Sequence, residues 1–213
     1  MFTILVTNTK GGCGKTTIAT GLAGAFAQTG WRTVLADCDR QKSSLGWASR
    51  RPAGAPAITP VNWSKDTQPL PPKTQLLVID SPAALKRKRL DELVRIADVV
   101  ILPVLPSVFD ETTTRRFLST LDKLKPVRKG KRPIAVVGNR MRARTRTAAR
   151  LNKFMSEVGQ RSVASLRDTQ LYPASAAAGL SLFDLATRRA ANFVDDWQPL
   201  LSFIDEIKAL REG

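Results

Sequence analysis

Eight residues near the start of the chain decide the fold, and they read Lys10-Gly11-Gly12-Cys13-Gly14-Lys15-Thr16-Thr17. Residues 2–7, just before them, are apolar and predict a short buried strand, while residues 16–28 have the composition of a helix. A glycine-rich turn from strand to helix lets backbone N–H groups curl around phosphate at the positive end of the helix dipole. The stretch therefore predicts a phosphate-binding loop.

This loop is a variant of the pattern G-x-x-x-x-G-K-[ST], because that spacing would place a glycine where Thr9 stands. The groups that the chemistry needs are still present: Lys15 for the β and γ phosphates, and the Thr16 hydroxyl for Mg²⁺. The alternative is a turn that binds nothing, and the strand and helix on either side disfavour it. The expected nucleotide contacts in the loop are Gly11, Gly12, Cys13, Gly14, Lys15, Thr16 and Thr17.

Short apolar runs alternate with helical segments along the rest of the chain. This alternation predicts the α/β class, with a mostly parallel, twisted sheet and helices on both of its faces. The further predicted strands are residues 33–36, 75–79, 99–104 and 134–137. The further predicted helices are residues 90–97, 112–124 and 147–158.

One segment interrupts the alternation. Residues 51–73 contain six prolines, which predicts a long connection with one edge strand near residues 58–63. Both flanks of this connection belong to the same alternation of strands and helices. We therefore expect residues 1–213 to form a single domain.

Charge and composition limit the classes of function. The chain has 34 Lys and Arg residues against 18 Asp and Glu, a formal net charge of +16. It has no histidine and only two cysteines, which excludes imidazole-dependent triads and four-thiolate metal sites within one chain. The N-terminus lacks the basic start of a secretory signal, and no apolar run approaches the roughly 18 to 20 residues that span a bilayer. We expect a cytoplasmic protein that binds polyanions.

The excess positive charge is regional. Between Asp122 and Glu157 lie twelve basic residues and no acidic one, which accounts for +12 of the +16. A charge run is usually a solvated face, but 34 residues without an acid favour non-specific binding to DNA phosphates. If about six of these groups each neutralise a phosphate, log K falls with log salt at a slope of about −5. The expected DNA contacts are Lys129, Lys131, Arg140, Arg142, Arg144, Arg146 and Arg150.

Three further segments carry a family resemblance. Residues 37–41 (DCDRQ) follow the second predicted strand, residues 76–82 (LLVIDSP) contain the third, and residues 166–168 (LRD) begin a tail that passes through Gly179. Together with the loop, in which Lys10 precedes the glycines, they resemble the ParA/MinD group of ATPases with a deviant Walker A motif. The resemblance covers essentially the whole chain and is nearest to short ParA proteins. It implies ATP and Mg²⁺ as ligands.

The resemblance also implies roles for individual residues. Lys15 and Lys10 are expected to be catalytic, Lys10 by reaching the phosphates of the partner subunit in a dimer. Asp39 is expected to orient the attacking water, since phosphoryl transfer depends on positioning and on stabilising charge. Thr16 and Asp80 are expected to hold Mg²⁺, Asp80 through water.

Other polar residues near the loop have two interpretations each. Asp37 either shares the role of Asp39 or is structural. Asn139, at the end of a predicted strand, either contacts the adenine edge or is a turn residue. Cys13 and Cys38 would lie near the nucleotide, where small side chains simply fit, and a redox role is the less favoured reading.

The tail offers a choice between the membrane and the core. Its polar positions include Asp195 and Glu206, which an anionic lipid surface would repel, so we expect the tail to pack on the core and not to dock on a membrane. The apolar residues at helical spacing are Phe193, Trp197, Leu200, Ile204 and Ile207.

The function implied by the resemblance is an ATPase that dimerises when ATP-bound and binds DNA non-specifically in that state. Hydrolysis stimulated by a ParB-like or other adaptor would let it position a plasmid, chromosome locus or protein cluster on the nucleoid. One alternative is an ATP-gated DNA-coating scaffold without functional hydrolysis, and another is a MinD-like spatial regulator. A metabolic enzyme with the same loop is disfavoured, because the basic surface would have no purpose there.

Overall fold

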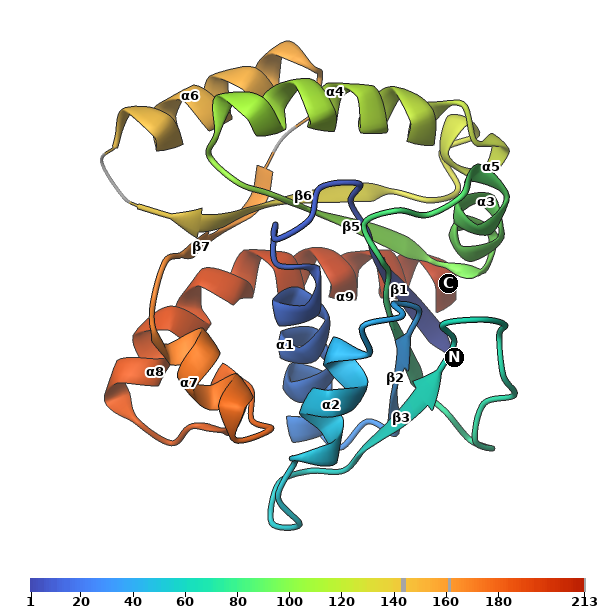
Figure 1. The fold of residues 1–213 in the computed structure, drawn as a ribbon, viewed down its shortest axis with the longest axis vertical. Coiled ribbons are helices and arrows are strands. Elements are labelled where there is room, and N and C mark those ends of the chain that lie inside the picture. Colours follow the sequence, from blue (N-terminus) through green and yellow to red (C-terminus); the bar gives the residue numbers. More distant parts are fainter. Residues whose placement is uncertain (143–144, 161, 213) are drawn as a thin grey trace.

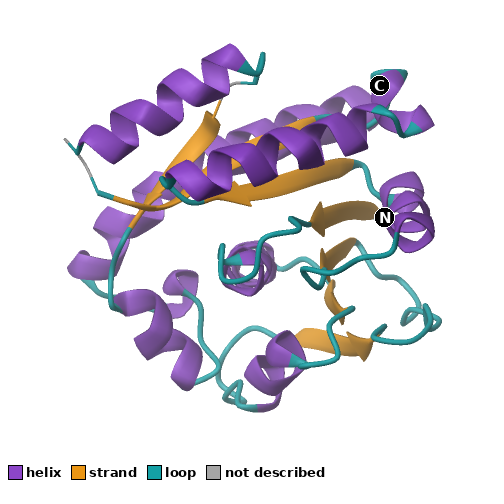
Figure 2. Cartoon of the chain, turned by 45° about the horizontal axis from the view of Figure 1, so that its top comes forward, coloured by secondary structure: helices purple, strands orange, loops and turns teal. Residues whose placement is uncertain are grey.

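A seven-stranded sheet forms the centre of the computed structural model, which describes residues 1–142, 145–160 and 162–212 (Figure 1). The strands pair in parallel in the order β3-β2-β4-β1-β5-β6-β7. Figure 2 shows them fanning out as a twisted layer with helices on either side. The predicted α/β class is confirmed. The strands are β1 (Phe2–Val6), β2 (Thr33–Asp37), β3 (Ile58–Asn62), β4 (Leu76–Asp80), β5 (Val99–Val104), β6 (Ile134–Met141) and β7 (Ser162–Arg167).

Helices occupy most of the crossovers between these parallel strands. The four predicted helices correspond to α1, α3, α4 and α6, each within a few residues of the expected bounds. The α-helices are α1 (Lys15–Gln28), α2 (Ser43–Ser49), α3 (Arg87–Ile96), α4 (Val108–Asp122), α5 (Lys125–Arg128), α6 (Arg146–Glu157), α7 (Leu171–Ala177), α8 (Arg188–Val194) and α9 (Gln198–Glu212). The short 3₁₀ helices are η1 (Leu182–Asp184) and η2 (Asp195–Trp197).

The sheet separates two apolar cores because alternate residues of a strand point to opposite faces. In β1, Ile4 and Val6 face a core formed with α1, α2 and α9, whereas Leu5 faces a second core formed with α3, α4 and α6. The central strands β1, β2, β4 and β5 are buried along their whole length, as expected for a parallel sheet that is covered on both sides.

The two edge strands show where sequence patterns succeed and fail. The edge strand expected within residues 58–63 is confirmed as β3, which pairs only with β2. By contrast, β7 was not predicted. Its sequence, SVASLR, has no continuous apolar run, because an edge strand with partly exposed positions does not need one.

The tail packs on the core, which confirms the expectation from its charges. Trp197, Leu200 and Ile204 are fully buried in the core that α1 also lines. The Trp197 ring lies so close to α1 that a Cβ at Gly21 would be 2.3 Å from it, which explains a glycine inside a helix. Among the residues that the structure describes, no helix has both the length and the apolar content needed to cross a membrane.

The order of the strands determines where a ligand can bind. After β1 the chain crosses to β2 on one side of the sheet, and β1 pairs with β5 on its other side. A crevice opens at such a point, outside the carboxyl ends of the strands. The predicted phosphate-binding loop, between β1 and α1, lies at this point.

Candidate functional site

The loop between β1 and α1 has a backbone that only glycine adopts readily. Gly12 and Gly14 have φ values of 75° and 94°, in the left-handed region, and Gly14 directly precedes α1. The first turn of α1 contains no acidic residue. The positive end of the α1 dipole is therefore available to an anion, as the sequence predicts.

Lys15 folds back into the loop. Its Nζ donates a hydrogen bond to the Lys10 carbonyl oxygen at 3.0 Å and lies 4.0 Å from Cys13 Sγ. The Cys13 thiol donates to the same carbonyl at 3.2 Å. The loop thus encloses the lysine that is expected to bind phosphate, and the second lysine contributes its backbone to this arrangement.

Two asparagines hold the loop, and one of them was not singled out from the sequence. The Asn139 Nδ2 donates to the Cys13 carbonyl at 2.8 Å, and a Cβ at Gly14 would lie 2.0 Å from this nitrogen. The Asn8 side chain accepts from the Lys10 backbone N–H at 3.0 Å and donates to the Pro103 carbonyl at 2.7 Å. The signal for Asn8 was its place directly after an apolar strand, where a buried amide needs partners.

Asp80 and Thr16, the predicted Mg²⁺ ligands, lie together. The Thr16 hydroxyl donates to Asp80 Oδ2 at 2.8 Å, across 64 residues of sequence. The other carboxylate oxygen, Oδ1, is buried and has no hydrogen-bond partner among the described residues. Burial raises the pKa of Asp80 from 3.8 to about 7, and the neighbouring Asp37 adds to this effect.

An orphaned carboxylate oxygen beside a hydroxyl fits a hydrated divalent cation. Mg²⁺ prefers oxygen ligands and usually keeps several waters, so it needs few protein groups. A cation here would give Asp80 Oδ1 a partner and would favour the charged form of the carboxylate. Thr16 and Asp80 are the residues that would hold it.

Asp37 and Asp39 differ in their surroundings. Asp37 is fully buried, and its Oδ2 accepts hydrogen bonds from the backbone N–H groups of Ser44 and Leu45, both at 3.0 Å, at the start of α2. Its Oδ1 accepts from the Asp39 N–H at 2.9 Å. Of the two interpretations of Asp37, the structural one accounts for both oxygens. Asp39 is half-buried, and within the described residues its carboxylate accepts one hydrogen bond, from the Gln41 N–H at 3.0 Å.

Both cysteines are buried. Burial is the main cause that raises the pKa of the Cys38 thiol to about 12, partly opposed by the nearby Arg89. A thiol that stays protonated is a poor nucleophile, which favours the interpretation of Cys38 as a small residue that fits its place.

The predicted DNA contacts do not form one group. Lys129 and Lys131 precede β6, whereas Arg140 and Arg142 lie at its other end (Figure 1). The six residue steps of β6 from Ile134 to Arg140 separate the two sets by about 20 Å at about 3.3 Å per residue. Arg144 lies outside the described residues.

Acids from elsewhere in the chain neutralise part of the basic stretch. Arg142 pairs with Asp168 at 3.0 Å, and Arg150 pairs with Glu111 at 2.7 Å. These acids lie outside the acid-free stretch, so a count along the sequence could not include them. Within the described chain, Lys129, Lys131, Arg140 and Arg146 are exposed and form no ion pair.

Comparisons with known proteins agree with this geometry. "Maintenance of carboxysome distribution protein A" from Halothiobacillus neapolitanus is 30% identical over 197 residues, which cover 88% of this chain and 89% of that protein. The Cyanothece McdA–ATP complex superposes with a TM-score of 0.76 at 17% identity, covering 98% of this chain and 96% of that one. A plasmid partition protein from Borrelia burgdorferi, bound to AMPPNP, gives 0.72 at 18% identity, covering 94% and 98%.

A family model places the chain more firmly than any single relative. The model described as the CobQ/CobB/MinD/ParA nucleotide binding domain matches residues 4–182, which include the loop, Asp80, Asn139 and β7. The chain therefore belongs to the CobQ/CobB/MinD/ParA family of nucleotide-binding domains.

Proposed function

We propose that this chain is a Mg²⁺-dependent ATPase that positions a cargo by binding DNA when ATP-bound and releasing it after hydrolysis. The observation that carries the proposal is the contact between the Thr16 hydroxyl, at the start of α1, and Asp80, at the end of β4, whose second oxygen is buried without a partner among the described residues. A buried carboxylate in this state is costly unless a cation or a proton compensates it. A nucleotide held by the loop with its cation supplies that compensation.

The residues of the loop would act by position and charge. The N–H groups around Gly12 and Gly14 would hold phosphate oxygens, and Lys15 would exchange the Lys10 carbonyl for the β and γ phosphates. Thr16 and Asp80 would hold Mg²⁺, which would supply positive charge to stabilise the phosphates. Lys10 would reach the phosphates of a partner subunit, and Asp39 would orient the attacking water. The contact of Asn139 with adenine stays a prediction, since its amide nitrogen serves the loop in this structure.

A dimer that forms when ATP is bound would present the exposed cations to DNA phosphates. An adaptor protein would stimulate hydrolysis, and the protein would then dissociate from DNA. This implies a cytoplasmic protein that associates with the nucleoid. The cargo we propose is a protein body, because the relative with 30% identity is named for carboxysome distribution. Likeness to the plasmid partition protein, at 18% identity, concerns the fold alone.

Substitution of the loop lysine tests the nucleotide switch. We expect Lys15→Ala to abolish ATP binding and the ATP-dependent retention of the protein on DNA, because no other group replaces the lysine at the β and γ phosphates. Lys123→Ala, at an exposed lysine next to α4, is the control and should bind ATP like the original protein. DNA retention that persists in Lys15→Ala with and without ATP would contradict the switch.

Substitution of Asp39 separates the ATPase from a scaffold. We expect Asp39→Ala to bind ATP and DNA but to release phosphate about a hundredfold more slowly, since positioning of the nucleophile contributes roughly 10²–10⁴ in rate. The protein should then stay on DNA after ATP is withdrawn. If phosphate release and the time of DNA release are both unchanged, the scaffold without functional hydrolysis is the better description.

A further inference from the structure

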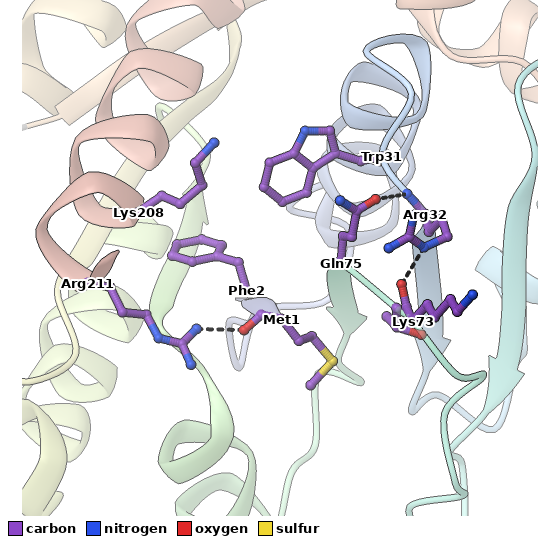
Figure 3. A pocket seen from close by; sticks show the side chains of 9 residues that line it. Met1, Phe2, Trp31, Arg32, Lys73, Gln75, Lys208 and Arg211 are labelled. Carbon is purple, nitrogen blue, oxygen red and sulfur yellow. Dashed lines mark hydrogen bonds between the residues drawn. The ribbon is translucent and has the colours of Figure 1, made fainter. Parts of the chain in front are cut away.

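A basic hollow of about 590 Å³ lies at the amino end of the sheet, away from the glycine-rich loop (Figure 3). It is bounded by the start of β1, the turn before β2, the loop before β4 and the end of α9. The start and the end of the chain meet here, because Arg211 donates a hydrogen bond of 2.6 Å to the Met1 carbonyl. Nothing in the proposed function uses this hollow.

The charge of the hollow has one sign. Arg32 and Lys73 stand on one side and Lys208 and Arg211 on the other, and none of the nine described residues that line it is acidic (Figure 3). Asp98 pairs with Arg211 at 2.6 Å, and Asp205 lies 3.5 Å from Lys208.

Arg32 and Lys73 form no ion pair within the described chain. Instead, Arg32 Nε donates to the Lys73 carbonyl at 2.5 Å. The hollow therefore keeps an excess of positive charge that a ligand can use.

Apolar surface lies between these cations. The Phe2 and Trp31 rings lie between the two pairs of cations, and the Lys208 ammonium is 4.4 Å from the centre of the Trp31 ring (Figure 3). A second hollow of about 480 Å³ shares Arg211 with the first, and its lining includes Lys131, Arg132 and Leu210 and one acid, Asp98, which pairs with Arg211. Met1 and Leu210 are 58% and 80% exposed, and with Ile96 they are the exposed large hydrophobic residues of the described chain. Met1 lines the first hollow and Leu210 the second, so an exposed apolar side chain borders the cations in each.

We infer that the two hollows together bind an acidic peptide segment of a partner protein, with its carboxylates on the cations and an apolar side chain beside Trp31 or Leu210. Charge complementarity selects an acidic partner, and the exposed apolar groups select a peptide over a phosphate chain. Duplex DNA would be bound through outward-facing cations alone and would not use the apolar side chains. Lys208 packs on the Trp31 indole, whereas Arg32, Lys73 and Arg211 are exposed, so duplex DNA is included in the test. This site goes beyond the proposed function and does not depend on it.

Trp31 provides a local signal for the test. The chain has four tryptophans, and Trp47, Trp63 and Trp197 are buried, so Trp31 alone is partly exposed. The full chain without nucleotide would be titrated with a synthetic peptide of repeated Glu-Glu-Leu, and tryptophan fluorescence recorded. We expect a saturable change that Trp31→Phe removes. The matching Lys-Lys-Leu peptide should produce no saturable change.

Charge reversal then locates the binding. We expect the double substitution Lys73→Glu and Lys208→Glu to weaken binding of the acidic peptide about tenfold or more, because like charges would face each other in the hollow. Lys65→Glu, at an exposed lysine outside both hollows, should leave the affinity within about twofold, as screened charges at a distance contribute little.

Three results would overturn the inference. They are no saturable change with the acidic peptide, equal binding of the acidic and basic peptides, or a Trp31 signal from short duplex DNA that is lost on reversal of Lys73 and Lys208. Failure of ATP hydrolysis would not affect this experiment. It therefore tests the docking site separately from the proposed function.

Discussion

The two ends of the same sheet attract negative charge by different means. At the carboxyl end, the glycine-rich loop and the starts of α1 and α2 offer backbone N–H groups, and Lys15, Asp37 and Asp80 are buried. At the amino end, where α1 and α9 finish, the positive charge comes from side chains such as Arg32, Lys208 and Arg211 around open hollows.

Helix polarity explains this difference. In a parallel sheet with helical crossovers, the helices that follow strands begin at the carboxyl end, so the positive ends of their dipoles point to that end. The opposite end receives helix carboxyl termini, which carry partial negative charge. An anion can bind there only if side-chain cations outweigh the dipoles, and α9 has Arg211 in its last turn. Substitutions that change the backbone should therefore impair anion binding at the carboxyl end, and substitutions that change side-chain charge should impair it at the amino end.

Gly14→Ala should have the largest effect. The φ of 94° and the 2.0 Å approach to Asn139 Nδ2 leave no room for a Cβ. We expect loss of nucleotide binding and a fall of about 3 to 4 kcal/mol in the free energy of unfolding, from the left-handed backbone and the lost amide contact. Urea unfolding and equilibrium dialysis with ATP would measure both. Gly54→Ala is the control, because Gly54 lies outside the loop and its Cβ would meet nothing within 4 Å, and equal damage there would contradict the account.

Asp80 should make stability depend on pH. Its pKa in the folded chain, about 7, lies above its value of 3.8 in the absence of burial. Between these two values the folded chain holds a proton that the unfolded chain has released, so raising the pH lowers the free energy of unfolding. We expect a loss of about 3 kcal/mol between pH 4 and pH 8 without Mg²⁺ and nucleotide.

Asp80→Asn should remove this pH dependence and leave the nucleotide-free protein more stable at pH 8 than the original chain. Urea unfolding at both pH values would measure it. Asp39→Asn is the control, since it leaves Asp80 and its burial unchanged. An unchanged pH dependence in Asp80→Asn would show that another group is responsible.

The cations at the two ends of β6 should differ in their dependence on ATP. We expect Arg140→Glu with Arg146→Glu, at the end that the loop shares, to lower the salt slope of ATP-dependent DNA binding by about two. Lys129→Glu with Lys131→Glu should leave that slope unchanged, because Lys131 lines the second basic hollow instead. Fluorescence anisotropy of labelled duplex DNA at several salt concentrations would compare them. An equal change of the salt slope in both double variants would show that the two ends of β6 do not differ in DNA binding.

The parts of the site that lie on short segments could be predicted from sequence. Lys15 and Thr16 follow β1 directly, and Asp80 ends the apolar strand β4. Pairing of β1 with β4 places Val6 beside Asp80, so two local patterns meet once a parallel sheet is assumed. The strand β7 escaped prediction, because its mixed pattern is not distinctive in isolation.

Contacts between distant segments could not be predicted. Arg142 pairs with Asp168 and Arg150 pairs with Glu111. These acids neutralise part of the positive charge that a count along the sequence assigns to the stretch between Asp122 and Glu157. The role of Asn139 also depends on a contact between distant segments. The sequence left open whether Asn139 contacts adenine or is a turn residue. The structure shows its amide on the Cys13 carbonyl, 126 residues away.

The sequence by itself determined the α/β class, because strand and helix periods are local properties. It also predicted the phosphate-binding loop and Thr16 and Asp80 as Mg²⁺ ligands, from the glycine-lysine spacing and the family resemblance. Only the tertiary structure decided which charges gather. It divided the basic residues between the ends of β6, and it joined Arg32, Lys73, Lys208 and Arg211, from both ends of the chain, around one hollow. Electrostatic interaction depends on distance in space, and in a parallel sheet that distance is set by strand order, not by position along the chain.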